Sequence, residues 1–181
     1  MSSLFKLPTT YSEFLNEFSP KLLDAIMADI RTIDDTIEKE RTTLLQLEES
    51  YGLKDAVDYI DRWLQVLNGT LNIRNPLVET TKIAFKIYDR FSHLYITDLK
   101  LVSDKILFGD GVQFYGSVDA QAILKAFGDY NIERKGKIYE KYKKSVIPKV
   151  ESYSEDKRTM DREAIKTILD RNAKLFGGKN E

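Results

Sequence analysis

The chain has 181 residues, with 28 Lys and Arg against 29 Asp and Glu, so its formal net charge at pH 7 is −1 when the single His is neutral. This length favours one domain, which we place over residues 1–176, with residues 177–181 as a flexible tail. Hydrophobic residues make up 42% and charged residues 31%, a balance typical of globular rather than disordered chains. The absence of Cys excludes disulfides, thiolate catalysis and Cys-ligated metal centres.

Neither targeting nor membrane insertion is indicated. The first residues contain no apolar run typical of a signal peptide, and no stretch approaches about 18 apolar residues. We therefore expect no membrane span and a cytoplasmic location, or a place in a particle assembled inside the cell. Frequent Ile, Lys, Glu and Tyr with few Gln favour a thermophilic source. An AT-rich coding sequence gives a similar composition.

The first long apolar pattern predicts a helix from Pro20 to about Ser50. Ser19 can cap free N–H groups and Pro20 suits the first helical position, while Gly52 provides a stop. Glu40 is the one polar interruption, which either marks where this helix tilts toward solvent or fixes its register. The apolar positions recur at spacings of three, four and seven: Leu23, Ile26, Ile30, Ile33, Ile37, Leu44 and Leu47.

Two further helices follow in the predicted order. One covers about Leu53 to Leu67 and ends at Asn68-Gly69. The other begins at Asn75-Pro76 and continues to about Leu107, with two adjacent apolar rows that predict burial against at least two neighbours. Its β-branched and aromatic residues around 94–102 leave a strand as a local alternative.

A glycine-rich break at 108–116 precedes the remaining elements. Ser117 or Asp119 can cap a fourth helix that continues toward Val146 and ends before Pro148, with a break allowed near 129–136 at two glycines. A last, shorter helix is predicted over 159–176. The predicted fold is all-α, an antiparallel bundle of four or five helices, two or three of them long.

Charge is distributed unevenly along the chain. Residues 1–50 hold five basic and ten acidic residues, whereas 132–149 hold seven basic residues against Glu133 and Glu140. We interpret the basic faces of the third and fourth helices as a candidate surface for nucleic acid or an acidic partner, with solvated helix faces as the alternative. Its residues are Arg134, Lys137, Lys141 and Lys144, with Tyr139 and Tyr142 beside them, and Lys86, Arg90 and His93.

Catalytic and cofactor motifs are missing from the sequence. There is one His and no Glu-x-x-His, which excludes a carboxylate-bridged di-iron site, and there is no phosphate-binding glycine loop. His93 falls on a polar helix face, where it is poorly placed for a catalytic triad. We therefore predict no enzyme activity, no catalytic residue, no metal site and no cofactor. No segment carries a motif specific enough to name a family.

Two functions remain open at this stage. The first is a protein–protein interaction or assembly subunit, in which the acidic first helix of one copy meets basic helices of another. The second is a nucleic-acid-binding subunit that docks DNA or RNA through the basic face at 134–149. The net charge of −1 places protein assembly first, because binding to a polyanion is driven by net neutralisation of phosphates.

Overall fold

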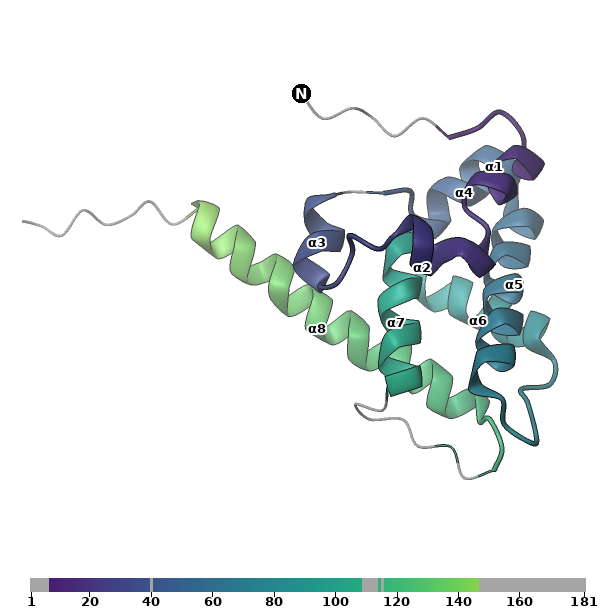
Figure 1. Cartoon of the computed structure of the whole chain (residues 1–181). Coiled ribbons are helices and arrows are strands. Elements are labelled where there is room, and N and C mark those ends of the chain that lie inside the picture. Colours follow the sequence, from purple (N-terminus) through teal and green to yellow (C-terminus); the bar gives the residue numbers. More distant parts are fainter. Residues whose placement is uncertain (1–6, 40, 109–113, 115, 147–181) are drawn as a thin grey trace, which may run out of the picture. The chain divides into compact units, whose positions relative to one another are not determined.

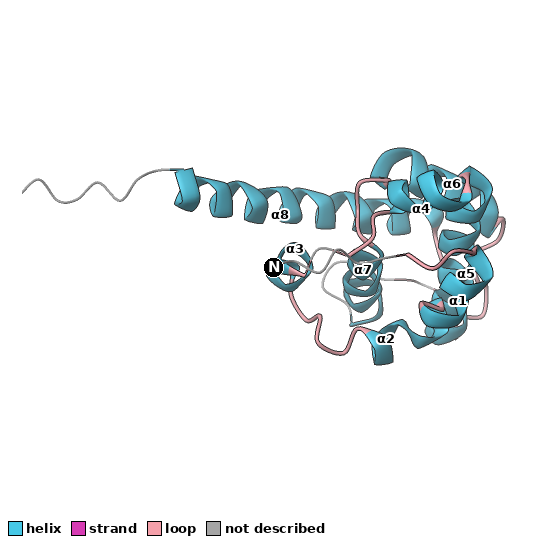
Figure 2. Cartoon of the chain, turned by 90° about the horizontal axis from the view of Figure 1, so that it is seen from above, coloured by secondary structure: helices cyan, strands magenta, loops and turns pink. Residues whose placement is uncertain are grey.

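The fold was analysed in a computed structural model that describes residues 7–39, 41–108, 114 and 116–146 (Figure 1). The all-α class is confirmed over these residues, where two isolated bridges, Thr43 with Tyr95 and Asn75 with Ser117, are the only strand-like pairings. Figure 2 shows helices joined by short connections throughout the described part. The chain divides into two compact units, residues 1–139 and 140–181. Of the second unit the structure describes only the end of one helix.

The continuous helix predicted over Pro20–Ser50 is wrong. After α1 (Tyr11–Glu17), the chain forms the 3-10 turn η1 (Pro20–Leu22) and three short helices, α2 (Leu23–Ile26), α3 (Ile33–Glu38) and α4 (Leu44–Tyr51). Ser19 precedes η1 without making a side-chain cap. Glu40, the predicted interruption of the apolar pattern, lies outside the described residues.

Capping residues explain why this region is divided. Thr32 accepts a hydrogen bond from the N–H of Asp35, whose carboxylate accepts one from the N–H of Thr32, and Thr43 and Gln46 form the same reciprocal pair. Such capping boxes start a helix, because they satisfy N–H groups that have no partner within it. Each capping box therefore favours the start of a new helix at a position where the apolar spacing alone predicts that the preceding helix continues.

The second predicted helix is present as α5 (Leu53–Leu71) and is four residues longer than expected. Asn68 does not end it. Its side chain instead accepts from the N–H of Leu77 and donates to the carbonyl of the same residue, both at 3.1 Å, which ties down the following connection. The helix ends at Asn72, in the left-handed conformation (φ 48°) that asparagine tolerates better than most residues.

The third predicted helix is also divided, into α6 (Thr80–Phe91) and α7 (Ile96–Phe108). The connection between α6 and α7 is hydrogen-bonded to the start of α4. The N–H groups of Leu44 and Leu45 donate to the carbonyls of Leu94 and Ser92, respectively. In the opposite direction, the N–H of Ile96 donates to the carbonyl of Thr42. The free N–H groups at the start of one helix thus find their acceptors in the break between two others. The expected start at Asn75-Pro76 is wrong as well, because Asn75 bonds to Gly116 and Val118 instead.

The fourth predicted helix is confirmed as α8 (Ala120–Val146), without the break allowed near 129–136. Asp119 caps it, its carboxylate accepting from the N–H of Gln121 at 2.9 Å. The helix predicted over 159–176 and the tail at 177–181 lie outside the described residues, as does most of the glycine-rich break at 108–116.

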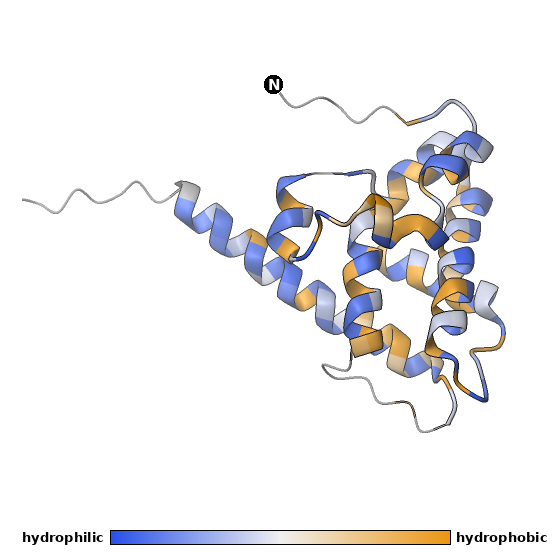
Figure 3. Ribbon diagram, viewed as in Figure 1, coloured by the Kyte–Doolittle hydropathy of each residue, from blue (hydrophilic) through white to orange (hydrophobic). Residues whose placement is uncertain are grey.

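The core is built around α5, which packs against α4 and α6, while α7 contacts α2, α3 and α5. Figure 3 shows apolar positions on α5 and α7 and mostly polar ones toward the end of α8. Phe127 fixes the first half of α8 to this core. Its ring centroid lies 5.5 Å from that of Trp63 on α5 and 5.4 Å from that of Phe91 on α6. These edge-on and stacked contacts are the arrangements aromatic rings prefer.

Candidate functional site

The predicted basic stripe on α8 begins inside the protein rather than on its surface. Arg134 is buried, and its Nε lies 3.1 Å from Oδ2 of the fully buried Asp98 on α7. The two charges form an ion pair, although Nε makes no hydrogen bond there. The guanidinium also lies over the ring of Tyr95, 4.9 Å from its centroid. Arg134 is therefore engaged inside the fold, and its guanidinium is not presented at the surface where an external partner would meet it.

Asp98 is the centre of a buried polar network. Its Oδ2 also accepts from the N–H of Tyr95 at 2.8 Å, which caps α7, and its Oδ1 accepts from the hydroxyl of Tyr130 on α8 at 2.5 Å. Burial raises the pKa of the Tyr130 phenol, and the charge of Asp98 raises it further. Both carboxylate oxygens are thus engaged, so Asp98 acts as an anchor between α7 and α8 rather than as an accessible base.

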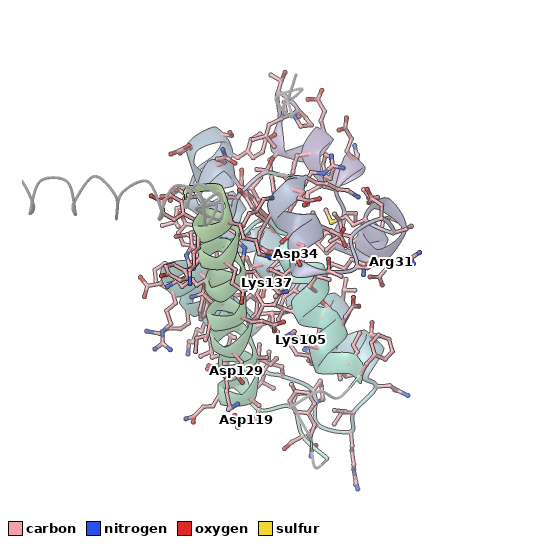
Figure 4. All side chains as sticks on the ribbon, turned by 90° about the vertical axis from the view of Figure 1, so that its left-hand side faces the viewer. Arg31, Asp34, Lys105, Asp119, Asp129 and Lys137 are labelled. Atoms are coloured by element: carbon pink, nitrogen blue, oxygen red, sulfur yellow. The ribbon has the colours of Figure 1, made fainter. Side chains whose placement is uncertain are left out.

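Lys137 is also engaged within the chain. It lies 3.5 Å from Asp34 on α3 (Figure 4). Nearby, Lys105 on α7 pairs with Glu133 on α8. These charges line a cavity of about 370 Å³ between α3, α7 and α8, whose wall also includes Arg31. The sequence suggested that acidic residues near the start of one copy pair with basic helices of another copy. In the structure, Asp34 and Lys137 form such a pair within one chain.

The remaining predicted residues on α8 are exposed. Tyr139 and Tyr142, whose helical spacing is more typical of core residues, both have most of their surface exposed to solvent, and Lys141 and Lys144 are exposed as well. The stripe therefore changes character along the helix. It is buried and paired at Arg134, paired at the surface at Lys137, and exposed at Lys141 and Lys144.

The third-helix residues do not share one continuous face, because the helix is broken between them. Lys86 and Arg90 are exposed on α6, whereas His93 lies in the connection to α7. His93 Nε2 lies 2.8 Å from Oδ1 of Asn131 on α8, a hydrogen bond to a neutral amide. This hydrogen bond joins the connection between α6 and α7 to α8.

A groove between α5 and α6 was not predicted from the sequence. This α5/α6 groove measures about 550 Å³, and its apolar part is formed by Val57 and by two large side chains that are partly exposed, Leu53 (41%) and Phe85 (47%). Asp58 and Asp61 lie along it. Its lining residues are Leu53, Lys54, Val57, Asp58, Asp61, Thr81 and Phe85.

The two carboxylates of the α5/α6 groove differ in their partners. Asp58 accepts from the hydroxyl of Tyr11 at 2.8 Å and from Nε of Arg62 at 2.5 Å. Asp61 accepts from the side-chain amide of Gln65 through Oδ2, while its buried Oδ1 has no hydrogen-bond partner among the described residues. A buried acceptor without a donor is unfavourable, so this oxygen lowers the stability of the fold.

A second surface lies on the side of α8 that faces away from the core. Ile132 and Tyr139 are 72% and 66% exposed, with the exposed Lys135 between them; we call these three residues the outward face of α8. They recur at spacings of three and four, which places them on one side of a helix. The buried residues of the same helix occupy the other side: Ile123, Ala126, Phe127, Tyr130 and Arg134.

A third depression, about 780 Å³, lies between α1, η1 and α5 and is lined mainly by small and polar side chains such as Ser12, Asn16 and Thr70. Its guanidinium, Arg62, is the one paired with Asp58. Among the described residues that line it, the charged side chains are Lys21 and Arg62.

Metal sites, membrane-spanning helices and similarity to known proteins were each looked for. In the part of the chain that the structure describes, no cluster of three His, Cys, Asp or Glu residues could hold a metal ion, and no helix is long and apolar enough to cross a membrane. No protein-family model, no curated protein and no solved structure matches this chain.

Proposed function

We propose that this chain is a non-enzymatic protein-binding subunit that assembles with other protein through the outward face of α8. The observation that carries this proposal is the exposure of Ile132 and Tyr139 on a helix whose opposite side is fixed to the core. Large apolar side chains that share one helix face, with a lysine between them, are typical of protein interfaces, where Tyr is enriched.

The chemistry of the described polar groups supports binding rather than catalysis. Asp98 is buried and held by Tyr130, Arg134 and a backbone N–H, which leaves it no free oxygen for proton transfer. His93 is exposed and bonded to an amide. A general base needs access to its substrate and a partner that tunes it, and neither residue has both.

Nucleic-acid binding is the second candidate, and it has one specific observation in its favour. Tyr139 is exposed on the same helix as Lys135, Lys143 and Lys144, which are also exposed. Aromatic rings can stack on bases while lysines neutralise phosphates. The net charge of −1 and the engagement of Arg134 and Lys137 inside the chain place this candidate second.

Photo-crosslinking tests the proposal. A photoreactive phenylalanine analogue replaces Tyr139 in the full chain, expressed in the cells that naturally make it, and adducts are identified by mass spectrometry. We expect covalent adducts with protein from position 139 and none from a control at Glu49, which is exposed on α4. Adducts with nucleic acid would support the second candidate, and equal labelling from both positions would contradict the proposal.

The finer expectations from the sequence belong to the same proposal. We propose that the helices of this chain are arranged as an antiparallel bundle and that it acts inside the cell or in a particle assembled there. We also propose that it comes from a thermophile or one of its viruses. Composition supports the last of these through frequent Ile, Lys and Glu.

A further inference from the structure

Two surfaces of this chain, which lie on different helices, each combine apolar side chains with charge of opposite sign. The α5/α6 groove has an apolar part between Leu53 and Phe85 and carboxylates beside it. The outward face of α8 presents apolar Ile132 and Tyr139 with the cationic Lys135 between them. We propose that the α5/α6 groove of one copy binds the outward face of α8 of a second copy. This inference rests on the proposed function and names its partner.

The lengths of the two surfaces agree. At about 1.5 Å per residue, Ile132 and Tyr139 lie roughly 10 Å apart along α8, and Leu53 and Asp61 lie roughly 12 Å apart along α5. Two turns of one helix therefore face two turns of the other. Asp61 lies at one end of this span, so with Lys135 opposite it the apolar end of the groove at Leu53 faces one of the two apolar side chains of the outward face.

The charges of the two surfaces are opposite. The lining of the groove contains Lys54 and two aspartates, of which Asp58 is paired with Arg62 and Asp61 is not paired with a described cation, whereas the outward face carries a lysine and no acid. Asp61 accepts only from the side-chain amide of Gln65 and pairs with no cation among the described residues, so its carboxylate is the partner for the ammonium of Lys135. Asp58 is unsuited to this role, because Arg62 and Tyr11 already bond to it.

Two glycines beside the outward face support close approach of another helix. Gly128 and Gly136 lie four residues before and after Ile132, and a Cβ added at either would meet no atom of the described chain within 4 Å. Glycine destabilises a helix interior relative to alanine. The packing inside one copy therefore gives no reason for these glycines, whereas a second copy packed on Ile132 gives one.

Because the groove and the outward face are different surfaces, the association runs head to tail. Each copy that binds through its groove leaves its α8 face open to a further copy, so the product is either a closed ring or an open filament. This differs from a symmetric pair of α8 helices, in which one surface serves both partners.

Light scattering on the purified full chain over a range of concentrations tests this arrangement. We expect the wild type to have a mass above that of one chain, and both Phe85→Glu and Ile132→Glu to reduce it to that of one chain. Phe108→Glu is the matched control, because Phe108 is also a large exposed side chain (81%) but belongs to neither surface. Its mass should equal that of the wild type.

Mixing the two monomeric variants is the decisive step. Phe85→Glu retains its α8 face and Ile132→Glu retains its groove, so their mixture should form a one-to-one complex of twice the monomer mass. Recovery also shows that both variants are folded. A monomeric wild type, an equal loss of mass in the Phe108 control, or a mixture that stays monomeric would each overturn the inference. Adducts from position 139 with other proteins only, together with a monomeric wild type, would reject the second copy and leave protein binding intact.

Discussion

The hydroxyl of Tyr130 on α8 donates a hydrogen bond to Oδ1 of Asp98 in the first turn of α7, and both side chains are completely buried. The other oxygen of Asp98 accepts from the N–H of Tyr95 and pairs with Arg134. One carboxylate thus starts α7 and fixes α8 beside it. Both Asp98 and Arg134 are buried, so removing the charge of one leaves the charge of the other buried without a counterion.

The first prediction follows from this contact. Asp98→Asn keeps the shape of the side chain but leaves the Arg134 charge unpaired, so we expect a loss of about 3–5 kcal/mol in the free energy of unfolding, measured by urea denaturation. Asp129→Asn is the matched control, since Asp129 forms an exposed pair with Lys125 on the same helix as Arg134. Its loss should be at most about 1 kcal/mol. Equal effects of the two substitutions would show that the network around Asp98 contributes no more than a surface pair.

The helical class was predictable because apolar spacing of three and four persists through most of the chain, but the ends of the helices depend on contacts that spacing does not contain. The break between α6 and α7 supplies the carbonyls that the first N–H groups of α4 require. These partners lie about fifty residues apart in sequence. The capping pairs Thr32 with Asp35 and Thr43 with Gln46 are local and could have been found, since each is a threonine followed three residues later by an acid or an amide.

The second prediction tests these caps. Thr43→Ala removes the acceptor for the N–H of Gln46, and we expect a loss of about 1 kcal/mol in the free energy of unfolding. Thr70→Ala serves as the control, because the hydroxyl of Thr70 bonds only to the carbonyl of Val66 within α5 and alanine is the better helix former. The control should be neutral or slightly stabilising. A loss as large in the control would mean that the cap at Thr43 has no special role.

The third prediction concerns the glycines of α8. Gly136→Ala meets no atom of the described chain and replaces glycine inside a helix, so it should stabilise one copy by about 0.5–1 kcal/mol. Gly52→Ala is the contrasting variant. Gly52 has φ 95°, which alanine adopts only with strain, so the same substitution should destabilise there. Both substitutions are made in the Ile132→Glu variant, which is expected to be monomeric, and the free energy of unfolding is measured by urea denaturation.

The fourth prediction concerns alkaline pH. Burial raises the pKa of Tyr59, and burial with the charge of Asp98 raises that of Tyr130. A phenol whose pKa is higher in the folded state stabilises the fold fully below its unfolded value. This contribution is lost as pH rises through the folded value. The free energy of unfolding should therefore fall as pH rises above about 10. Tyr130→Phe should make the free energy of unfolding fall less steeply with pH, as measured by urea denaturation at several pH values. An equally steep fall in that variant would contradict the conclusion that Tyr130 contributes to the pH dependence.

The candidate site was predicted only in part. The lysines of α8 could be identified because their charge density is visible in the sequence, whereas exposure of Tyr139 and Tyr142 could not be predicted from helical spacing. Burial of Arg134 depends on Asp98, which belongs to a helix whose start was not predicted. The α5/α6 groove was missed for a different reason. Leu53 fits the apolar pattern of its own helix and Phe85 lies off the apolar rows of its own, but neither position indicates that the two side chains meet across a groove between two helices.

The last prediction separates charge pairing inside one copy from pairing between copies. Asp34 on α3 and Lys137 on α8 lie 3.5 Å apart in the same chain and are both partly exposed. We therefore expect Asp34→Lys and Lys137→Asp each to lower the free energy of unfolding slightly, and the double variant to recover most of the loss. The coupling should be about 0.2–1 kcal/mol, as for other exposed pairs, and should weaken as salt is added. Neither single variant should change the solution mass, because assembly uses the outward face of α8 and Lys137 lies toward α3. A fall in mass with either single variant, reversed in the double variant, would instead show that these charges pair between copies.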